Sequence, residues 1–289
     1  MASILLLKRR IQASQNVSKT TKAMQMIAAS KMKRAQEAAL ATRPYVAKLM
    51  SMTGNIVSKI DEGQKINHPY IREDRLTNKT LILVLSPDKG LCGGLVTNLV
   101  REFLTYNKTE KDSYFLTVGK KIESQIAHRG SDVVASFTFG NTTPKMEMVY
   151  PIIRIIDEYY TSKKVDSVKI LTTHFTSIFS QTPKITNILP ITIPEQTQEK
   201  TAETLYTFEP SLTEMLPSLL KHYLETTVYQ HLLESFVSEQ AARMIAMQNA
   251  TDNANGIIED LKLEYNKTRQ AKITSEILDI SSAAITATV

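Results

Sequence analysis

The chain has 289 residues, 42% hydrophobic and 22% charged, which is enough for one or two domains with a substantial core. Its single cysteine, Cys92, excludes an internal disulfide framework and favours a reducing compartment. No apolar run approaches the roughly 18 residues that a membrane-spanning helix needs, so no such helix is expected.

The net charge of +6 is concentrated near the N-terminus, before the first acidic residue, Glu37. The basic residues there are Lys8, Arg9, Arg10, Lys19, Lys22, Lys31, Lys33 and Arg34. This stretch is either a solvated helix face or a surface for an acidic protein or a nucleic acid. Because no aromatic residue precedes Tyr45, nucleic acid is the less favoured partner.

The N-terminal stretch predicts a helix over about 2–60, kinked or interrupted near Pro44, because proline removes a backbone donor. Residues at alternating three- and four-residue steps form a lean seam, with Ser and Thr where a stable coiled coil would carry Leu. The seam residues are Ile4, Leu7, Ile11, Ser14, Ser18 and Thr21. The alternative is an ordinary amphipathic helix with incidental Ser and Thr.

The middle of the chain alternates strands and helices, after a polar loop at 61–78. Strands are expected at 80–86, 114–118, 133–139, 167–176 and 184–193, and helices at 95–106, 120–129 and 144–160. The first strand is apolar on both faces, as in parallel sheets. The fold class is therefore α/β, with a βαβ, Rossmann-like and mostly parallel sheet domain over about 75–200.

A polar linker at 195–203 leads to a last long helix over 208–289, whose start has capping-box spacing between Ser211 and Glu214. An apolar stripe at helical spacing runs through Leu216, Leu220, Leu224, Val228, Leu232 and Phe236, and resumes at Ile273, Ile277, Ile280 and Ala284. A helix of this length would extend roughly 110 Å and needs a partner helix.

The first and last helices flank the sheet domain, so they are expected to pair antiparallel as a coiled coil. The last helix is longer by roughly 15 residues, which leaves an overhang on the order of 20–30 Å. This tip, 273–289, is rich in small and apolar residues. Alone in water it would fray, so it is either disordered or enclosed by another protein.

No pattern in the chain predicts catalysis, cofactor binding or a metal site. The glycines at 90, 93 and 94 match neither G-x-G-x-x-G nor the P-loop, and more simply permit a tight turn and close packing. Cys92 lies in that turn and is expected to be a buried structural thiol. The histidines at 68, 128, 174, 222 and 231 show no metal or triad spacing.

Three stretches carry a resemblance to a known family: KAMQMIAASKMKRAQ at 22–36, SPDKGLCGG at 86–94, and EQAARMIAMQNATDNANGIIEDLKLEYNKTRQAKITSEILDISSAA at 239–284. Together they resemble the gamma subunits of F-type ATP synthases, in the right order over essentially the whole chain. The resemblance begins close to Met1, which leaves no room for a transit peptide and favours a bacterial chain.

The resemblance implies a central shaft inside a ring of three alpha and three beta subunits. The sheet domain is its foot, resting with the epsilon subunit on the membrane-embedded ring of c subunits. Ion flow turns the c ring and the shaft, and the catalytic sites are driven through different affinities. Such a chain is non-catalytic, binds no nucleotide or cofactor, and is peripheral at the cytoplasmic face of the cell membrane.

The resemblance also implies residues that contact the surrounding ring. They are Met24, Lys31, Lys33, Arg34, Arg243, Gln270, Thr274 and Glu276. The basic residues would face acidic loops of the beta subunits, through weak, screened pairs that permit sliding.

Two other classes of protein stay open on the residues alone. A nucleotide-binding Rossmann-type enzyme with helical arms would bind nucleotide as an isolated chain. A long-coil scaffold or nucleic-acid clamp would bind heparin or DNA with a steep salt dependence.

Overall fold

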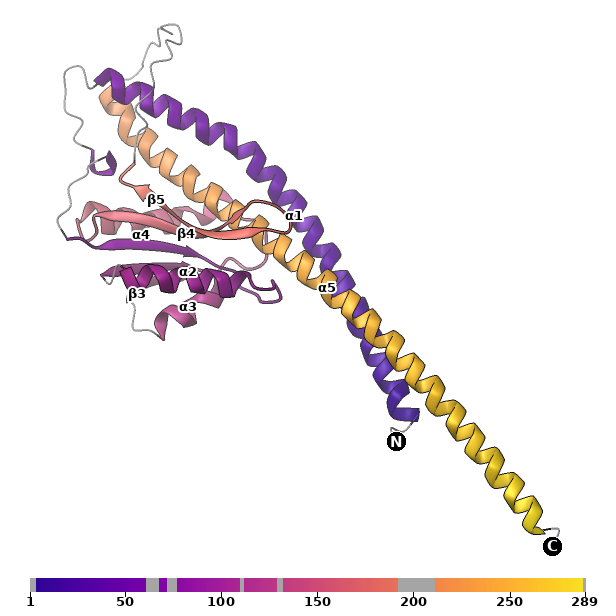
Figure 1. Ribbon diagram of the computed structural model, residues 1–289. Helices are drawn as coiled ribbons and strands as arrows, with labels where there is room; N and C mark the ends of the chain where they lie inside the picture. The colour runs from indigo at the N-terminus through magenta and orange to yellow at the C-terminus, as the bar shows by residue number, and fades with distance from the viewer. Residues whose placement is uncertain are drawn as a thin grey trace. The chain divides into compact units, whose positions relative to one another are not determined.

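The computed structural model describes residues 4–60, 68–71, 77–109, 112–128, 132–191 and 211–287 (Figure 1). The chain divides into two compact units. Unit 1 combines Met1–Ala28 with Arg243–Val289, and unit 2 comprises Ala29–Ala242. Two long helices, α1 (Ile4–Ile60) and α5 (Leu212–Ala287), contribute to both units.

Unit 1 is an antiparallel pair of helices, as predicted. The Thr21 and Thr251 hydroxyl oxygens lie 2.7 Å apart, and the Ser18 hydroxyl donates to the Asn255 side-chain oxygen at 2.8 Å. From the first pair to the second, the residue number falls from 21 to 18 on α1 and rises from 251 to 255 on α5, so the two helices run antiparallel. The predicted seam is also confirmed, because all its members are buried or half-buried: Ile4, Leu7, Ile11, Ser14, Ser18 and Thr21.

Unit 2 contains a five-stranded sheet in the order β3-β2-β1-β4-β5. The strands are β1 (Thr80–Leu85), β2 (Ser113–Val118), β3 (Asp132–Phe137), β4 (Ser167–Phe175) and β5 (Gln181–Leu189). All neighbouring strands are parallel except β4 and β5, which form an antiparallel hairpin at one edge. The predicted mostly parallel α/β sheet is therefore confirmed.

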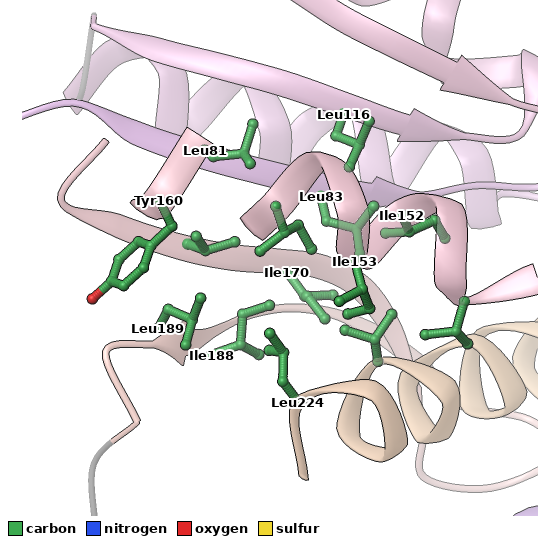
Figure 2. Close-up of a cluster of buried hydrophobic side chains, with 14 of the residues drawn as sticks. Leu81, Leu83, Leu116, Ile152, Ile153, Tyr160, Ile170, Ile188, Leu189 and Leu224 are labelled. Carbon is green, nitrogen blue, oxygen red and sulfur yellow. The ribbon is translucent and has the colours of Figure 1, made fainter. Parts of the chain in front are cut away.

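The sheet is covered on both faces, which explains the uninterrupted apolar sequence of its central strand β1. Ile82 and Val84 point into a core with α2 (Leu95–Thr109) and α3 (Lys120–Ala127). The alternate residues Leu81, Leu83 and Leu85 point into a second core with α4 (Tyr150–Thr161) and α5. Figure 2 shows this second core, to which α4 contributes Ile152 and Ile153 and α5 contributes Leu224.

The apolar stripe of α5 packs differently from the sequence-based expectation. That expectation assigned it to a partner helix, but its members are all buried, and most of them lie in the core of the sheet: Leu216, Leu220, Leu224, Val228, Leu232 and Phe236. Five of the six belong to one cluster with β1, β4 and α4. Long side chains suit this place because a twisted sheet offers a broader apolar surface than a single helix does.

Most element boundaries shift by a few residues, and three differences from the predictions are larger. The prediction was a kink or an interruption near Pro44, and helix α1 continues through that residue without interruption. The helix predicted at 144–160 is divided into a 3₁₀ turn, η2 (Met146–Met148), and α4, which has proline in its first turn. Strand β5 begins at Gln181, before the predicted 184, because a tight turn over Ser177–Ser180 brings it directly back along β4.

The segments between the sheet and the long helices are described only in part. A short 3₁₀ turn, η1 (Pro69–Ile71), lies within the loop predicted at 61–78. The linker predicted at 195–203 lies outside the described residues. The domain boundaries 1–60, 75–200 and 208–289 stay predictions.

Candidate partner-contact surfaces

The C-terminal end of α5 is an exposed helix in unit 1. The chain stays helical to Ala287, and every side chain from Arg269 to Ser281 is exposed. The exposed fractions of Ile277 and Ile280 are 61% and 70%. Apolar side chains exposed together on one helix are a feature of interaction surfaces.

Three predicted contact residues lie on this exposed end of α5. Gln270, Thr274 and Glu276 are all exposed. The Thr274 hydroxyl donates to the Gln270 backbone carbonyl at 3.0 Å, and the Glu276 carboxylate lies 3.6 Å from the Lys272 ammonium. These contacts lie within α5, so the polar ends of the three side chains remain accessible to another protein.

Two further predicted contact residues lie at the other end of unit 1. Met24 is 39% exposed, and it lies beside exposed Met26 and Ile27 on α1. Arg243 is only 7% exposed, so its side chain is covered within the chain itself. A contact between Arg243 and another subunit stays a prediction.

The predicted basic contacts on α1 divide into two kinds. Lys33 and Arg34 are exposed in unit 2 and can meet an acidic surface. Lys31 is half-buried, and its ammonium donates to the backbone carbonyl of Asn141 at 2.6 Å. The structure therefore brings Lys31 to a loop of its own chain, a contact that could not be predicted from the spacing of its neighbours in sequence.

A charged cluster around Glu234 joins α1, α5 and the end of β4 in unit 2. The Glu234 carboxylate lies 3.1 Å from the Arg43 guanidinium and 3.3 Å from His174 Nδ1. The Gln230 side-chain amide donates to it at 3.2 Å. Burial raises the pKa of Glu234, but the hydrogen bonds from Gln230 and Arg43, together with the nearby His231 and His174, lower the pKa overall.

His231 lies beside this cluster and is held neutral by burial. Desolvation lowers the pKa of His231, the Glu234 charge partly opposes this, and His174 and Lys184 add to the lowering. The sequence did not predict this cluster, because α5 and β4 are distant in sequence. The one available signal was the spacing of His231 and Glu234, which places both on one side of a helix.

Helix α5 fills the crevice at the end of the sheet where Rossmann-type proteins bind nucleotide. In open sheets this crevice lies at the carboxyl ends of the strands where the strand order reverses, here between β1 and β4. The Ser238 hydroxyl on α5 donates to the Thr173 carbonyl of β4 at 2.9 Å. The cavity left between the β1 end and Leu232, Ser235 and Phe236 is about 50 Å³. Small-molecule pockets measure roughly 300–1,000 Å³, so a nucleotide does not fit there.

One position at this end of the sheet requires glycine, and it lies outside the predicted cluster at 90–94. Gly119 has φ +97°, and a Cβ there would come 1.9 Å from the Ser86 backbone oxygen, so only glycine fits. Within the cluster, Gly93 has φ +58° and forms a turn, whereas a Cβ on Gly90 or Gly94 would meet only ordinary contacts. Cys92 is 2% exposed, which confirms that it is buried.

Two kinds of feature are absent from the described part of the chain. None of its helices is both long and apolar enough to cross a membrane. Among these same residues, no three His, Cys, Asp or Glu side chains are grouped so that they could hold a metal ion.

Known proteins similar to this chain share one identity. A family profile described as ATP synthase matches residues 3–286. Two ATP synthase gamma chains from strains of Dehalococcoides mccartyi are 41% and 40% identical, over 98% of this chain and 99% of theirs.

Solved structures with a similar fold come from rotary assemblies. The central stalk and c-ring structure of the Tetrahymena thermophila mitochondrial ATP synthase contains a chain 25% identical, with a TM-score of 0.58, over 80% of this chain and 99% of that one. A chain in the Euglena gracilis mitochondrial ATP synthase has a TM-score of 0.65 at 17% identity, over 97% of this chain and 93% of that one.

Proposed function

The chain belongs to the family of ATP synthase gamma chains, and from that premise we propose that it is the central shaft of an ATP synthase. It couples ion flow through a c ring to ATP synthesis or hydrolysis in an alpha/beta ring by rotation. It is thus a subunit of an enzyme complex, and within that complex its work is conformational coupling between distant sites.

The observation that carries this proposal is the exposed end of α5. Residues 269–281 are helical and exposed, with apolar side chains that unit 1 does not cover. A collar built from other chains would cover them. An apolar collar also suits rotation, because it offers few directional hydrogen bonds that would have to break at each step.

The partners follow from the family. The alpha and beta subunits surround the paired helices, three of each per shaft, and the c ring carries the sheet domain together with an epsilon subunit. Exposed Lys33 and Arg34 suit acidic loops of the beta subunits. Met24, Gln270, Thr274 and Glu276 are accessible for the other ring contacts, and Arg243 becomes accessible only if the seam around it rearranges.

We further propose that the shaft itself is non-catalytic and binds no nucleotide, cofactor or nucleic acid. The filled strand-end crevice supports the proposal for nucleotides, since α5 occupies the place where a nucleotide would lie. The shaft would act at the cytoplasmic face of the cell membrane as a peripheral protein, bound through the c ring.

Co-purification tests the proposal most directly. The tagged chain, expressed with the other subunits of its operon or cell, is expected to bring down two nucleotide-binding subunits in a three-three-one ratio, with ATPase activity. A stable isolated chain that hydrolyses ATP, or that binds nucleotide, heparin or DNA on its own, would instead support the enzyme or scaffold alternatives.

Substitution tests the contact residues within that complex. Gln270→Ala and Arg243→Ala are expected to lower the ratio of ions pumped to ATP hydrolysed. If pumping driven by ATP stays fully coupled in both variants, these residues are not ring contacts.

A further inference from the structure

We propose that the loop at Asn141 locks α1 and α5 to the sheet, and that Lys31 acts as a positioning residue in this lock rather than as a contact to a neighbouring subunit. The consequence for torque rests on the proposed function, whereas the lock itself is a property of unit 2 alone. Its parts come from five elements that the chain visits far apart in sequence.

The loop is first anchored to the ends of three parallel strands. Asp88, which follows β1, accepts hydrogen bonds from the backbone amides of Lys120 at 3.1 Å and Gly140 at 2.7 Å. Lys120 follows β2 and Gly140 follows β3. The Gly119 amide also donates to the Phe137 carbonyl at 2.8 Å. One carboxylate therefore fixes the position of the loop relative to the sheet, with charge-assisted bonds stronger than neutral ones.

Asn141, the residue after Gly140, is then hydrogen-bonded to both long helices. The Lys31 ammonium on α1 donates to the Asn141 backbone carbonyl at 2.6 Å. The Gln240 side-chain amide on α5 donates to the Asn141 side-chain oxygen at 3.0 Å. Gln240 is 1% exposed, and Lys31 lies between buried Ala28 and Met32 along α1. Neither hydrogen bond, the α1 limb from Lys31 or the α5 limb from Gln240, is therefore a loose surface contact.

The grip matters because a twist passes between the helices and the sheet through the contacts that join them. Among the described residues, these contacts are apolar packing in the core of the sheet and hydrogen bonds such as the two at Asn141. Apolar packing resists separation but is non-directional, whereas hydrogen bonds to a fixed point resist sliding and turning.

The two limbs can be removed separately. Asn141→Ala removes the α5 limb but keeps the backbone carbonyl that Lys31 binds. Lys31→Met removes the α1 limb and keeps most of the apolar stem of the side chain. Lys31→Arg preserves a donor, and Lys48→Met, at an exposed position of the same helix, is the matched control for loss of charge.

Hydrogen exchange of the full chain tests the lock without reference to rotation. Lys31→Met is expected to raise amide exchange around residue 31 of α1, and Asn141→Ala to raise it around residue 240 of α5, each by about tenfold, as expected for a loss of roughly 1.4 kcal/mol. The Gly140 amide keeps its Asp88 partner and stays protected. Unchanged exchange in both variants would overturn the lock.

Ion pumping by the assembled complex tests the role in torque. The Lys31→Met/Asn141→Ala double variant is expected to keep ATPase activity within about twofold and to lose more than half of its ions pumped per ATP, while Lys31→Arg and Lys48→Met stay coupled. If Lys31→Met loses coupling while Asn141→Ala keeps it, and amide exchange is unchanged in both variants, then Lys31 acts through a contact with another subunit. If the unaltered chain supports no coupled pumping, the shaft function fails, and the exchange result still decides the lock.

Discussion

Helix α5 is packed in two contrasting ways along its length. In unit 2 it buries Leu220, Leu224 and Val228 in the core of the sheet. In unit 1 its covered positions include Thr251 and Ala254, and the Thr251 hydroxyl meets that of Thr21 on α1. The first stretch is stabilised by a continuous set of large apolar side chains, whereas the second also relies on small residues and on hydroxyl contacts. A single helix can thus be a rigid part of one domain and a slim, weakly held element beyond it.

The largest effect is expected in the sheet core. Leu224→Ala leaves a cavity at a position that is 1% exposed, and such truncations cost about 2–5 kcal/mol. The matched control, Leu263→Ala, lies on the same helix at 70% exposure and should change stability by less than about 0.5 kcal/mol. Urea unfolding of the purified chain measures both, and equal effects would contradict the contrast.

The second effect is a pH dependence that belongs to unit 2. Above pH 6.5 the His231 imidazole is neutral in both the folded and the unfolded chain, so it adds no pH dependence. Below pH 6.5 the unfolded chain gains a proton that burial denies to the folded chain, because the folded pKa is lowered. Stability should fall by up to about 1.4 kcal/mol per pH unit on this account.

Thermal unfolding between pH 7.5 and pH 5 measures this term. His231→Leu should reduce the pH dependence without abolishing it, because burial lowers the pKa of His68 as well. His128→Gln, at an exposed position, should leave the dependence unchanged. The lowered pKa of Glu234 contributes stability that is lost only below about pH 4.5, outside this range. A profile as steep in His231→Leu as in the unaltered chain would exclude His231 as its source.

A smaller effect is expected at the seam of unit 1. Thr21→Val or Thr251→Val alone breaks the 2.7 Å hydroxyl pair and should cost about 0.5–1 kcal/mol. The double variant replaces both hydroxyls with methyl groups of similar shape and should be nearly neutral. Thr20→Val is the control, because its hydroxyl is exposed and bonded only along α1 to Asn16. Additive losses in the double variant would show that the pair carries no coupling.

The smallest effect on the isolated chain is expected at the exposed end of α5. Ile277→Ser at 61% exposure should change unfolding by less than about 0.5 kcal/mol. In the assembled complex the same change should weaken retention of the chain on the alpha/beta ring, measured by gel filtration at low concentration. Normal retention would mean that this side chain stays in water.

Periodic features of the fold were predictable from sequence. The seam from Ile4 to Thr21 and the buried stripe from Leu216 to Phe236 follow from spacing alone, because 3.6 residues per turn fixes which side chains share a face. The spacing does not show which element packs against each face. An apolar stripe has the same spacing whether it packs on a helix or on a sheet, so the α5 stripe was assigned to a partner helix instead of to the sheet.

Contacts between distant segments could not be predicted at single-residue level. Lys31 looks like any other member of a basic stretch, and only the folded chain brings Asn141 beneath it. Gly119 is isolated in sequence, and its necessity comes from the approach of Ser86 on the neighbouring strand end. Accessibility was better predicted, because exposed Thr274 and Glu276 lie in the overhang at 273–289 that the helix lengths predict.

The antiparallel seam also sets an order on synthesis. Thr21 and Thr251 are 230 residues apart, so α1 leaves the ribosome long before its partner exists. At roughly 5–20 residues per second the wait is on the order of 10–50 s. During that time the sheet can begin to form, but Leu7, which is fully buried in unit 1 of the folded chain, remains exposed on an unpartnered helix. The nascent chain is therefore a natural client for chaperones until its last residues emerge.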